Sequence, residues 1–382
     1  MFDKFLYYKI LCKEFPEFLR KYFNLPVLKR LAGVGLLCGT DWTPLYNNRF
    51  FYSRLDHSIG VALIIWNFTH DKKQALAGLF HDVSTPAFSH VSDFRSGDVL
   101  KQESTEEENK KIIHDCAELT ELLSQDGLKV SEVDDYHRFP IADNEIPHLS
   151  ADRLEYMFPS GIILNGSFDM ESTERLYNDI CIYNNELDGV ELAFKTEACA
   201  LEYCKRFCNT GLVLQHNENK IALQLLADIL SLAFELRIIS EENLFSMSEK
   251  QIIDVFDSFV EVKNFSDFKR IQENSLNCTG KRNLNSYAGK DDFESQNKKY
   301  RQFIQYYKTF RTMKKIERSD TPKKDYYNLS LEVKKRYINP LVASGKNKGK
   351  RITQISAEAE KTVEDFLAFS DSRYGCVKLV DI

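Results

Sequence analysis

The chain has 382 residues, of which 43% are apolar and 28% charged, and its net charge is −6. This composition excludes an intrinsically disordered chain. It is typical of a globular protein with one large domain, or with a core domain and an extension. No apolar run is long enough to span a membrane, and charged residues interrupt residues 1–18. We therefore expect neither a membrane segment nor a secretory signal.

The nine cysteines form no Cys-x-x-Cys pair, which favours a reduced, cytoplasmic protein. Cys199, Cys204 and Cys208 lie close together in the sequence. A zinc site there is an alternative to ordinary thiols on a helix face. Because no neighbouring histidine or further cysteine pair completes such a site, we favour the ordinary thiols.

Apolar periodicity predicts a mainly helical chain. Residues 57–70 are apolar on nearly every face and predict a buried helix. Residues 71–82 start with Asp71, a residue suited to an N-cap, and predict a second helix. Further helices are predicted at residues 104–127, 219–240, 246–260, 299–318 and 358–369. Because strand-like alternation is scarce, we expect an all-α fold.

A polar, weakly periodic stretch at residues 274–300 indicates a linker or loop. It would separate a core at residues 1–273 from an extension at residues 301–382. The sequence therefore predicts three parts, of which the third is α-rich.

The extension contains a strongly basic stretch. Residues 301–352 carry 15 Lys or Arg against 4 Asp or Glu, a net charge of +11 that leaves −17 for the rest of the chain. Such a stretch suits contact with phosphate, whether in a nucleotide, in nucleic acid or on an acidic partner, but a solvated helix face is an equal alternative. Its aromatic side chains could stack on bases, yet we favour a helix that packs them inward, namely Phe303, Tyr306, Tyr307 and Phe310.

Two histidines and two aspartates lie at predicted helix boundaries. His57 begins the buried helix, where a polar side chain costs free energy unless it has a partner. His81 and Asp82 end the next helix, and Asp152 begins a helical segment in "HLSADRLEYMF". One His-Asp pair at a helix end is more often a cap or a surface pair. Four such residues can bind one metal ion, with positions left open for water and substrate, and imidazole with carboxylate suits Mn, Fe or Zn.

The order of these motifs resembles that of a known family. "RLDHSIGVA", "GLFHDVSTPAFSH" and "ADRLEYMF" are similar to motifs of the HD-domain metal-dependent phosphohydrolases. They are closest to the branch that contains the deoxynucleoside triphosphate triphosphohydrolases. The resemblance covers residues 26–160. It implies an all-α fold, with an HD-domain helical core and an α-rich C-terminal extension.

The resemblance also implies roles for individual residues. One divalent transition metal (Mn, Fe, Zn or Ni, with Mg as a further candidate) would be bound by His57, His81, Asp82 and Asp152. The catalytic pair would be His90 and Asp93. Contacts to the substrate would come from Arg54, Arg153 and Tyr156. The implied reaction is cleavage of a phosphoester or phosphoanhydride in a nucleotide or other phosphorylated small molecule by a metal-activated water, with His90 assisting proton transfer.

Three positions depart from the family pattern. Thr85 replaces an internal histidine, Gln102 replaces the histidine of a His-Glu pair, and Ser160 replaces a sugar-recognising aspartate. Gln102 can hydrogen-bond phosphate but cannot carry a proton at neutral pH, so we expect it to contact substrate. The departures leave a second hypothesis open, a catalytically reduced metal- and nucleotide-binding protein that acts as a sensor or as a nucleic-acid-binding partner. Family members often assemble, so homo-oligomerisation is a further expectation.

Overall fold

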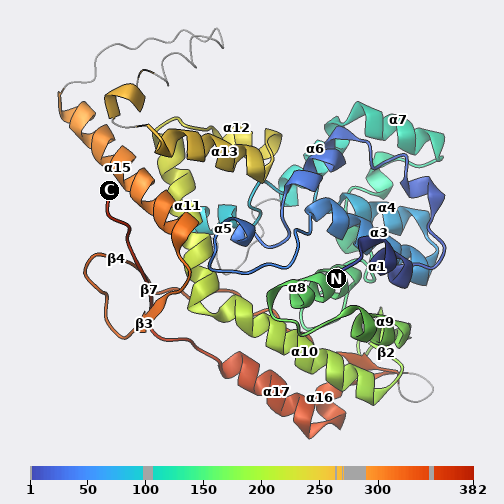
Figure 1. Cartoon of the computed structure of the whole chain (residues 1–382). Coiled ribbons are helices and arrows are strands. Elements are labelled where there is room, and N and C mark those ends of the chain that lie inside the picture. The colour runs from blue at the N-terminus through green and yellow to red at the C-terminus, as the bar shows by residue number, and fades with distance from the viewer. Residues whose placement is uncertain (1, 98–105, 263–264, 269, 271–289, 344–347) are drawn as a thin grey trace.

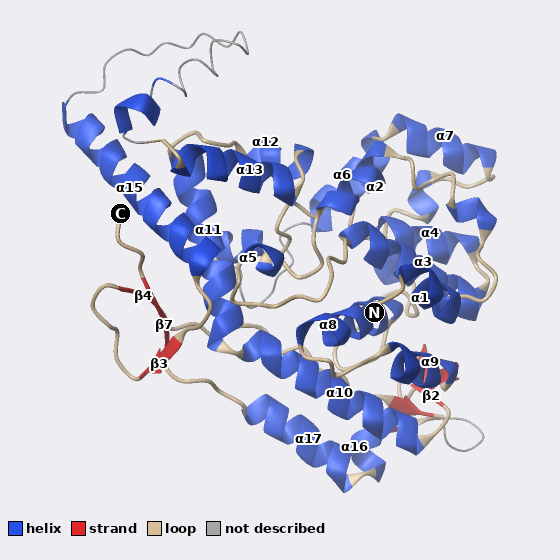
Figure 2. Cartoon of the chain, viewed as in Figure 1, coloured by secondary structure: helices blue, strands red, loops and turns tan. Residues whose placement is uncertain are grey.

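The computed structural model describes residues 2–97, 106–262, 265–268, 270, 290–343 and 348–382. This part of the chain is predominantly helical, as predicted, with a few short strands (Figure 2). The helices of the first half are α1 (Lys4–Leu11), α2 (Pro26–Lys29), α3 (Arg54–Thr69), α4 (Lys72–Phe80), α5 (Val91–Ser96), α6 (Glu106–Asp115), α7 (Ala117–Gln125), α8 (Ala151–Leu164) and α9 (Met170–Asn178). Those of the second half are α10 (Glu197–Gln215), α11 (Asn217–Glu235), α12 (Glu241–Ser246), α13 (Glu249–Val260), α15 (Lys290–Thr312), α16 (Ile352–Ile355) and α17 (Ala357–Ala368).

Helices α3 and α4 pack together and confirm the first two predicted helices. α3 begins three residues earlier than predicted, because Ser53 and Asp56 form a capping box in which each side chain accepts from the other's backbone N–H. Every residue from His57 to Ile65 is buried, which agrees with a helix that is apolar on nearly all faces. Asp71 caps α4, as predicted.

The predicted helix at residues 104–127 is interrupted. Residues 98–105 lie outside the described part of the chain, and the remainder forms α6 and α7 with an extended residue, Cys116, between them. In one continuous helix Ile113 and Leu119 would face directions roughly 120° apart. The break has a physical reason, since it allows both side chains to be fully buried.

The apolar residues form two cores that share the C-terminal part of the chain. One core is built on α3, α4, α8 and α10, and the other on α11, α13 and α15. In Figure 1, α15 runs beside α11 and α17 runs beside α10. Phe303, Tyr307 and Phe310 of α15 are buried in the second core, which confirms that they pack inward. Ile338 and Val363 belong to the first core.

Two small sheets complete the fold. The first has the order β1 (Ile180–Asn184), β2 (Val190–Phe194), β5 (Leu341–Val342) and β6 (Lys350–Arg351); the second has the order β3 (Glu317–Ser319), β7 (Tyr374–Lys378) and β4 (Tyr326–Leu329). β2 pairs in parallel with β5, and the other pairs are antiparallel. The first sheet therefore joins the middle of the chain to its C-terminal part.

Most of the predicted linker at residues 274–300 lies outside the described residues, and from Lys290 onward the chain is helical. The division into three parts stays a prediction. Among the described residues, no helix is both long enough and apolar enough to cross a membrane. The cytoplasmic location also stays a prediction.

Candidate metal centre and the cavity around it

His57 and His81 face each other across α3 and α4. Their Nε2 atoms lie 3.2 Å apart. The opposite ring nitrogen of each histidine is already engaged: Nδ1 of His57 donates to Glu155 Oε2 at 2.5 Å, and Nδ1 of His81 donates to the Gly78 carbonyl at 2.7 Å. These bonds fix the orientation of both rings, so that both Nε2 atoms point to one place.

The two predicted aspartate ligands lie at the same place. Asp152 Oδ1 is 3.0 Å from His57 Nε2 and 3.7 Å from His81 Nε2. Asp82 Oδ2 is 3.9 Å and 3.7 Å from the same two nitrogens. Donor atoms bound to one ion at about 2.0–2.2 Å are separated by distances of this order. The four side chains that the sequence singled out therefore form one cluster, and two imidazoles with two carboxylates fit Mn, Fe or Zn.

The electrostatics of the cluster favour a cation. Burial disfavours the charged form of each aspartate, but neighbouring charges outweigh it. Arg54 and the two histidines hold the pKa of Asp82 well below its usual range, and His57 does the same for Asp152. Burial likewise disfavours a charged His57, yet Glu155 and Asp152 raise the pKa of His57 to about 10. The pocket therefore stabilises positive charge at His57 Nε2.

Arg54 and Thr85 hold Asp82 from both of its oxygens. Arg54 Nη1 donates to Oδ2 at 2.9 Å, and the Thr85 hydroxyl donates to Oδ1 at 2.9 Å. Arg54 Nε also donates to the Ser89 hydroxyl at 3.0 Å. Thr85, which stands where the resembled family has a histidine, thus contacts a candidate metal ligand and orients it.

His90 and Asp93 form the pair that was predicted. His90 precedes the first turn of α5, and its Nδ1 donates to Asp93 Oδ2 at 2.8 Å. Burial lowers the pKa of His90, and the charges of Arg54 and Arg336 lower it further, against the opposing effect of Asp93. At neutral pH the ring is therefore uncharged, and its Nε2 can accept a proton.

The remaining predicted contacts lie in different settings. Arg153 is buried and binds the loop at residues 143–148 by donating to the His148 carbonyl at 2.8 Å and to Asn144, with Asp143 Oδ1 at 3.2 Å. Tyr156 lines the same cavity, and its buried hydroxyl has no hydrogen-bond partner within the described part of the chain. Gln102 lies outside the described residues. The roles of these three residues as substrate contacts stay predictions.

Glu155 is a residue that the sequence reasoning missed. It is fully buried, accepts the His57 Nδ1 bond, and also accepts from Tyr52 at 2.6 Å and Tyr7 at 3.2 Å. A signal existed, since Glu155 lies three residues after Asp152 on one helix face. The facing residue of α3 is Gly60, where a Cβ would lie 2.4 Å from Glu155 Oε1. The glycine therefore provides the space for this carboxylate.

Glu249, the first residue of α13, is a second missed residue. Its fully buried carboxylate accepts from the backbone N–H of Gly35 at 2.9 Å, from that of Phe88 at 3.1 Å, and from Trp42 Nε1 at 2.8 Å. Phe88 and Ser89 have φ angles of 66° and 51°, which non-glycine residues seldom adopt. Glu249 therefore holds the unusual turn that leads directly into His90.

A cavity of about 790 Å³ opens onto the cluster. Its lining includes all four candidate ligands and the His90–Asp93 pair. It also includes Ser160 and, from the C-terminal part of the chain, Lys334 and Arg336. The sequence gave no signal that this distant segment would reach the site. A volume of this size accommodates a nucleotide-sized ligand.

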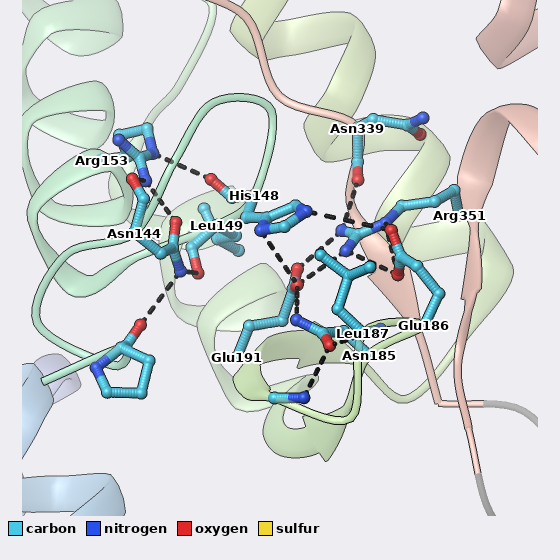
Figure 3. Close-up of polar contacts among 12 residues, drawn as sticks. Asn144, His148, Leu149, Arg153, Asn185, Glu186, Leu187, Glu191, Asn339 and Arg351 are labelled. Atoms are coloured by element: carbon cyan, nitrogen blue, oxygen red, sulfur yellow. Dashed lines mark hydrogen bonds and ion pairs between the residues drawn. The ribbon is translucent and has the colours of Figure 1, made fainter.

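Other cations of the basic stretch bind carboxylates of the protein itself. Figure 3 shows Arg351 bound to Glu191 at 2.7 Å and to Glu186 at 2.8 Å, with His148 beside both. Arg318 similarly bridges Glu218 and Asp371. These ion pairs fix the C-terminal part of the chain onto the rest of the molecule. A contact between residues 301–352 and nucleic acid stays a prediction.

Comparisons with known proteins agree with the fold. No protein-family model matches the chain. It is 28% identical over 155 residues to the uncharacterized protein YdhJ of Bacillus subtilis, covering 39% of this chain and 46% of that protein. It is 25% identical over 128 residues to the metal-dependent phosphohydrolase cns2 of Cordyceps militaris, covering 34% of this chain and 36% of that protein. The chain thus matches less than half the length of either curated relative.

Solved structures match almost the whole chain. A phosphohydrolase from Bacteroides thetaiotaomicron has a TM-score of 0.56 at 14% identity and covers 95% of this chain and 96% of its own. A hypothetical protein from Aquifex aeolicus has a TM-score of 0.54 at 17% identity, with coverages of 96% and 93%. The chain therefore has the helical fold of a phosphohydrolase, with a His and Asp cluster of the HD type.

Proposed function

We propose that the protein is a metal-dependent phosphohydrolase that cleaves a phosphoester or phosphoanhydride bond in a nucleotide-like substrate. The observation that carries this proposal is the convergence of His57, His81, Asp82 and Asp152, with both histidines oriented through Nδ1. A divalent ion held there would supply Lewis acidity, which lowers the pKa of a water molecule and polarises a phosphoryl oxygen.

The residues of the chain have separate tasks in this reaction. Asp82 and Asp152 are ionised at neutral pH and ready to bind a cation. His90, neutral and oriented by Asp93, takes a proton from the attacking water as the new O–P bond forms. As the bond from phosphorus to the leaving oxygen breaks, the same proton passes from His90 to that oxygen. Arg54 lies beside Asp82 and the cavity, where it can contact a phosphoryl oxygen.

The nucleotide class of the substrate is supported by the resemblance to the deoxynucleoside triphosphate triphosphohydrolase-like branch and by the size of the cavity. The relative cns2 is described as a metal-dependent phosphohydrolase, which agrees with the reaction class. Ser160 and Thr85 differ from that branch, so the substrate can differ from a deoxynucleoside triphosphate.

The test is phosphate release by purified, metal-loaded protein from a panel of nucleotides and of linear and cyclic phosphodiesters. Asp82→Asn should reduce release to background, because the variant removes a ligand charge while conserving the side-chain shape. Asp254→Asn, at an exposed ion pair with Lys250, is the matched control and should retain full activity. Metal binding without release from any compound of the panel would overturn the proposed function.

A further inference from the structure

One wall of the cavity is the extended segment Val333–Arg336 of the C-terminal region. Val333, Lys334 and Arg336 line the cavity. The segment forms no regular helix or strand, and side chains of an extended chain alternate in direction. Lys334 and Arg336 therefore share the cavity side, whereas Lys335, on the other side, donates to the carbonyls of Leu367 and Phe369 at the end of α17.

The segment is fixed on both sides of these two cations. Gln215, the last residue of α10, donates through Nε2 to the Lys334 carbonyl at 3.0 Å. Ile338 is fully buried, and the backbone N–H of Asn339 donates to the Pro147 carbonyl at 2.9 Å. Lys334 and Arg336 are thus held on a rigid wall, where binding a ligand requires little ordering of the backbone.

Arg336 is close enough to influence both sides of the proposed reaction centre. Its charge lowers the pKa of His90, adding to the larger effect of burial, and it opposes the rise that burial causes in the pKa of Tyr156. The guanidinium therefore belongs to the same cavity as the catalytic pair and the tyrosine. The candidate metal ligands, by contrast, contribute two ionised carboxylates to their part of the lining.

We propose that Lys334 and Arg336 form an anion subsite that binds a second phosphate group of the substrate, away from the phosphorus that is attacked. This inference rests on the proposed function and narrows its substrate class to phosphorylated compounds with more than one phosphate group. Arginine offers paired N–H donors that match phosphate geometry, and lysine adds a point charge. The subsite also explains part of the basic stretch that internal ion pairs do not use.

Calorimetry with two inorganic probes tests the subsite in the metal-loaded protein. The wild type should bind tripolyphosphate more tightly than orthophosphate. Arg336→Gln and Lys334→Gln should each weaken tripolyphosphate binding by about 10-fold or more, the effect of losing a charge-assisted hydrogen bond, with little change for orthophosphate. Lys324→Gln, an exposed lysine of the same stretch that does not line the cavity, is the matched control.

Turnover of p-nitrophenyl phosphate, which has a single phosphate, reports on the proposed function separately. If this ester or another of the panel is hydrolysed and Arg336→Gln leaves tripolyphosphate binding unchanged, the subsite is wrong while the proposed function stands. An equal loss of affinity for both probes also contradicts a second, distal subsite. If tripolyphosphate binding depends on Arg336 but nothing is hydrolysed, the proposed function fails instead.

Discussion

Glu249→Gln perturbs the buried carboxylate that holds the turn before His90. In the wild type, Oε1 accepts from Gly35 and Phe88 and Oε2 accepts from Trp42 Nε1. A glutamine can keep the first two bonds, but its amide N–H would face the indole N–H. Because the site excludes water, this opposition of donors should destabilise the protein by about 1–3 kcal/mol where Glu249 is neutral.

The pH dependence of this difference follows from the titration of Glu249. Burial raises the pKa of Glu249 to about 7, from 4.5, although its hydrogen bonds oppose the rise. A carboxyl with a raised folded-state pKa contributes fully below the unfolded pKa, and the contribution is lost as pH rises through the folded pKa. The wild type should lose about 3 kcal/mol from this group between pH 4.5 and pH 8, whereas the glutamine variant should not.

Urea unfolding followed by circular dichroism, in metal-free protein at pH 5 and pH 8, measures both effects. The wild type should be the more stable protein at pH 5, and its advantage should shrink or reverse at pH 8. Trp42→Phe combined with Glu249→Gln removes the opposed indole N–H, so the double variant should be less destabilised than the sum of the two single variants. A difference between wild type and Glu249→Gln that is the same at both pH values refutes this reasoning.

Two further predictions concern buried contacts. Gly60→Ala places a Cβ 2.4 Å from Glu155 Oε1, so unfolding experiments should show a loss of about 1–3 kcal/mol from overpacking. Metal titration should show weaker binding, by about 10-fold, because Glu155 orients a candidate ligand. Arg351→Met leaves the buried Glu191 unpaired and should cost about 3–5 kcal/mol, measured as a lower urea midpoint. Adding Glu191→Gln should recover part of that loss, and no recovery would contradict the ion-pair account.

The sequence predicted those parts of the molecule that depend on local patterns. The caps at Asp71 and Ser248 and the apolar faces of the long helices depend on neighbouring residues, and the structure confirms them. The break at Cys116 was missed because it serves the burial of side chains on both sides of it, which is a tertiary effect.

The candidate site divides in the same way. The motifs of the candidate ligands could be read from the chain, and their four side chains meet. Glu249 could not be found, because its partners Gly35 and Phe88 are 214 and 161 residues away. The placement of Arg336 in the cavity likewise depends on how the C-terminal segment packs against α10.

The central claim is that four side chains hold one divalent ion, and metal content per chain tests it most directly. Protein dialysed against Mn²⁺ and then against buffer should retain one ion per chain, measured by mass spectrometry of the metal. His81→Ala should retain almost none, whereas His114→Ala, at an exposed ion pair with Asp134, should retain the full amount. Equal metal content in the wild type and His81→Ala would contradict the account.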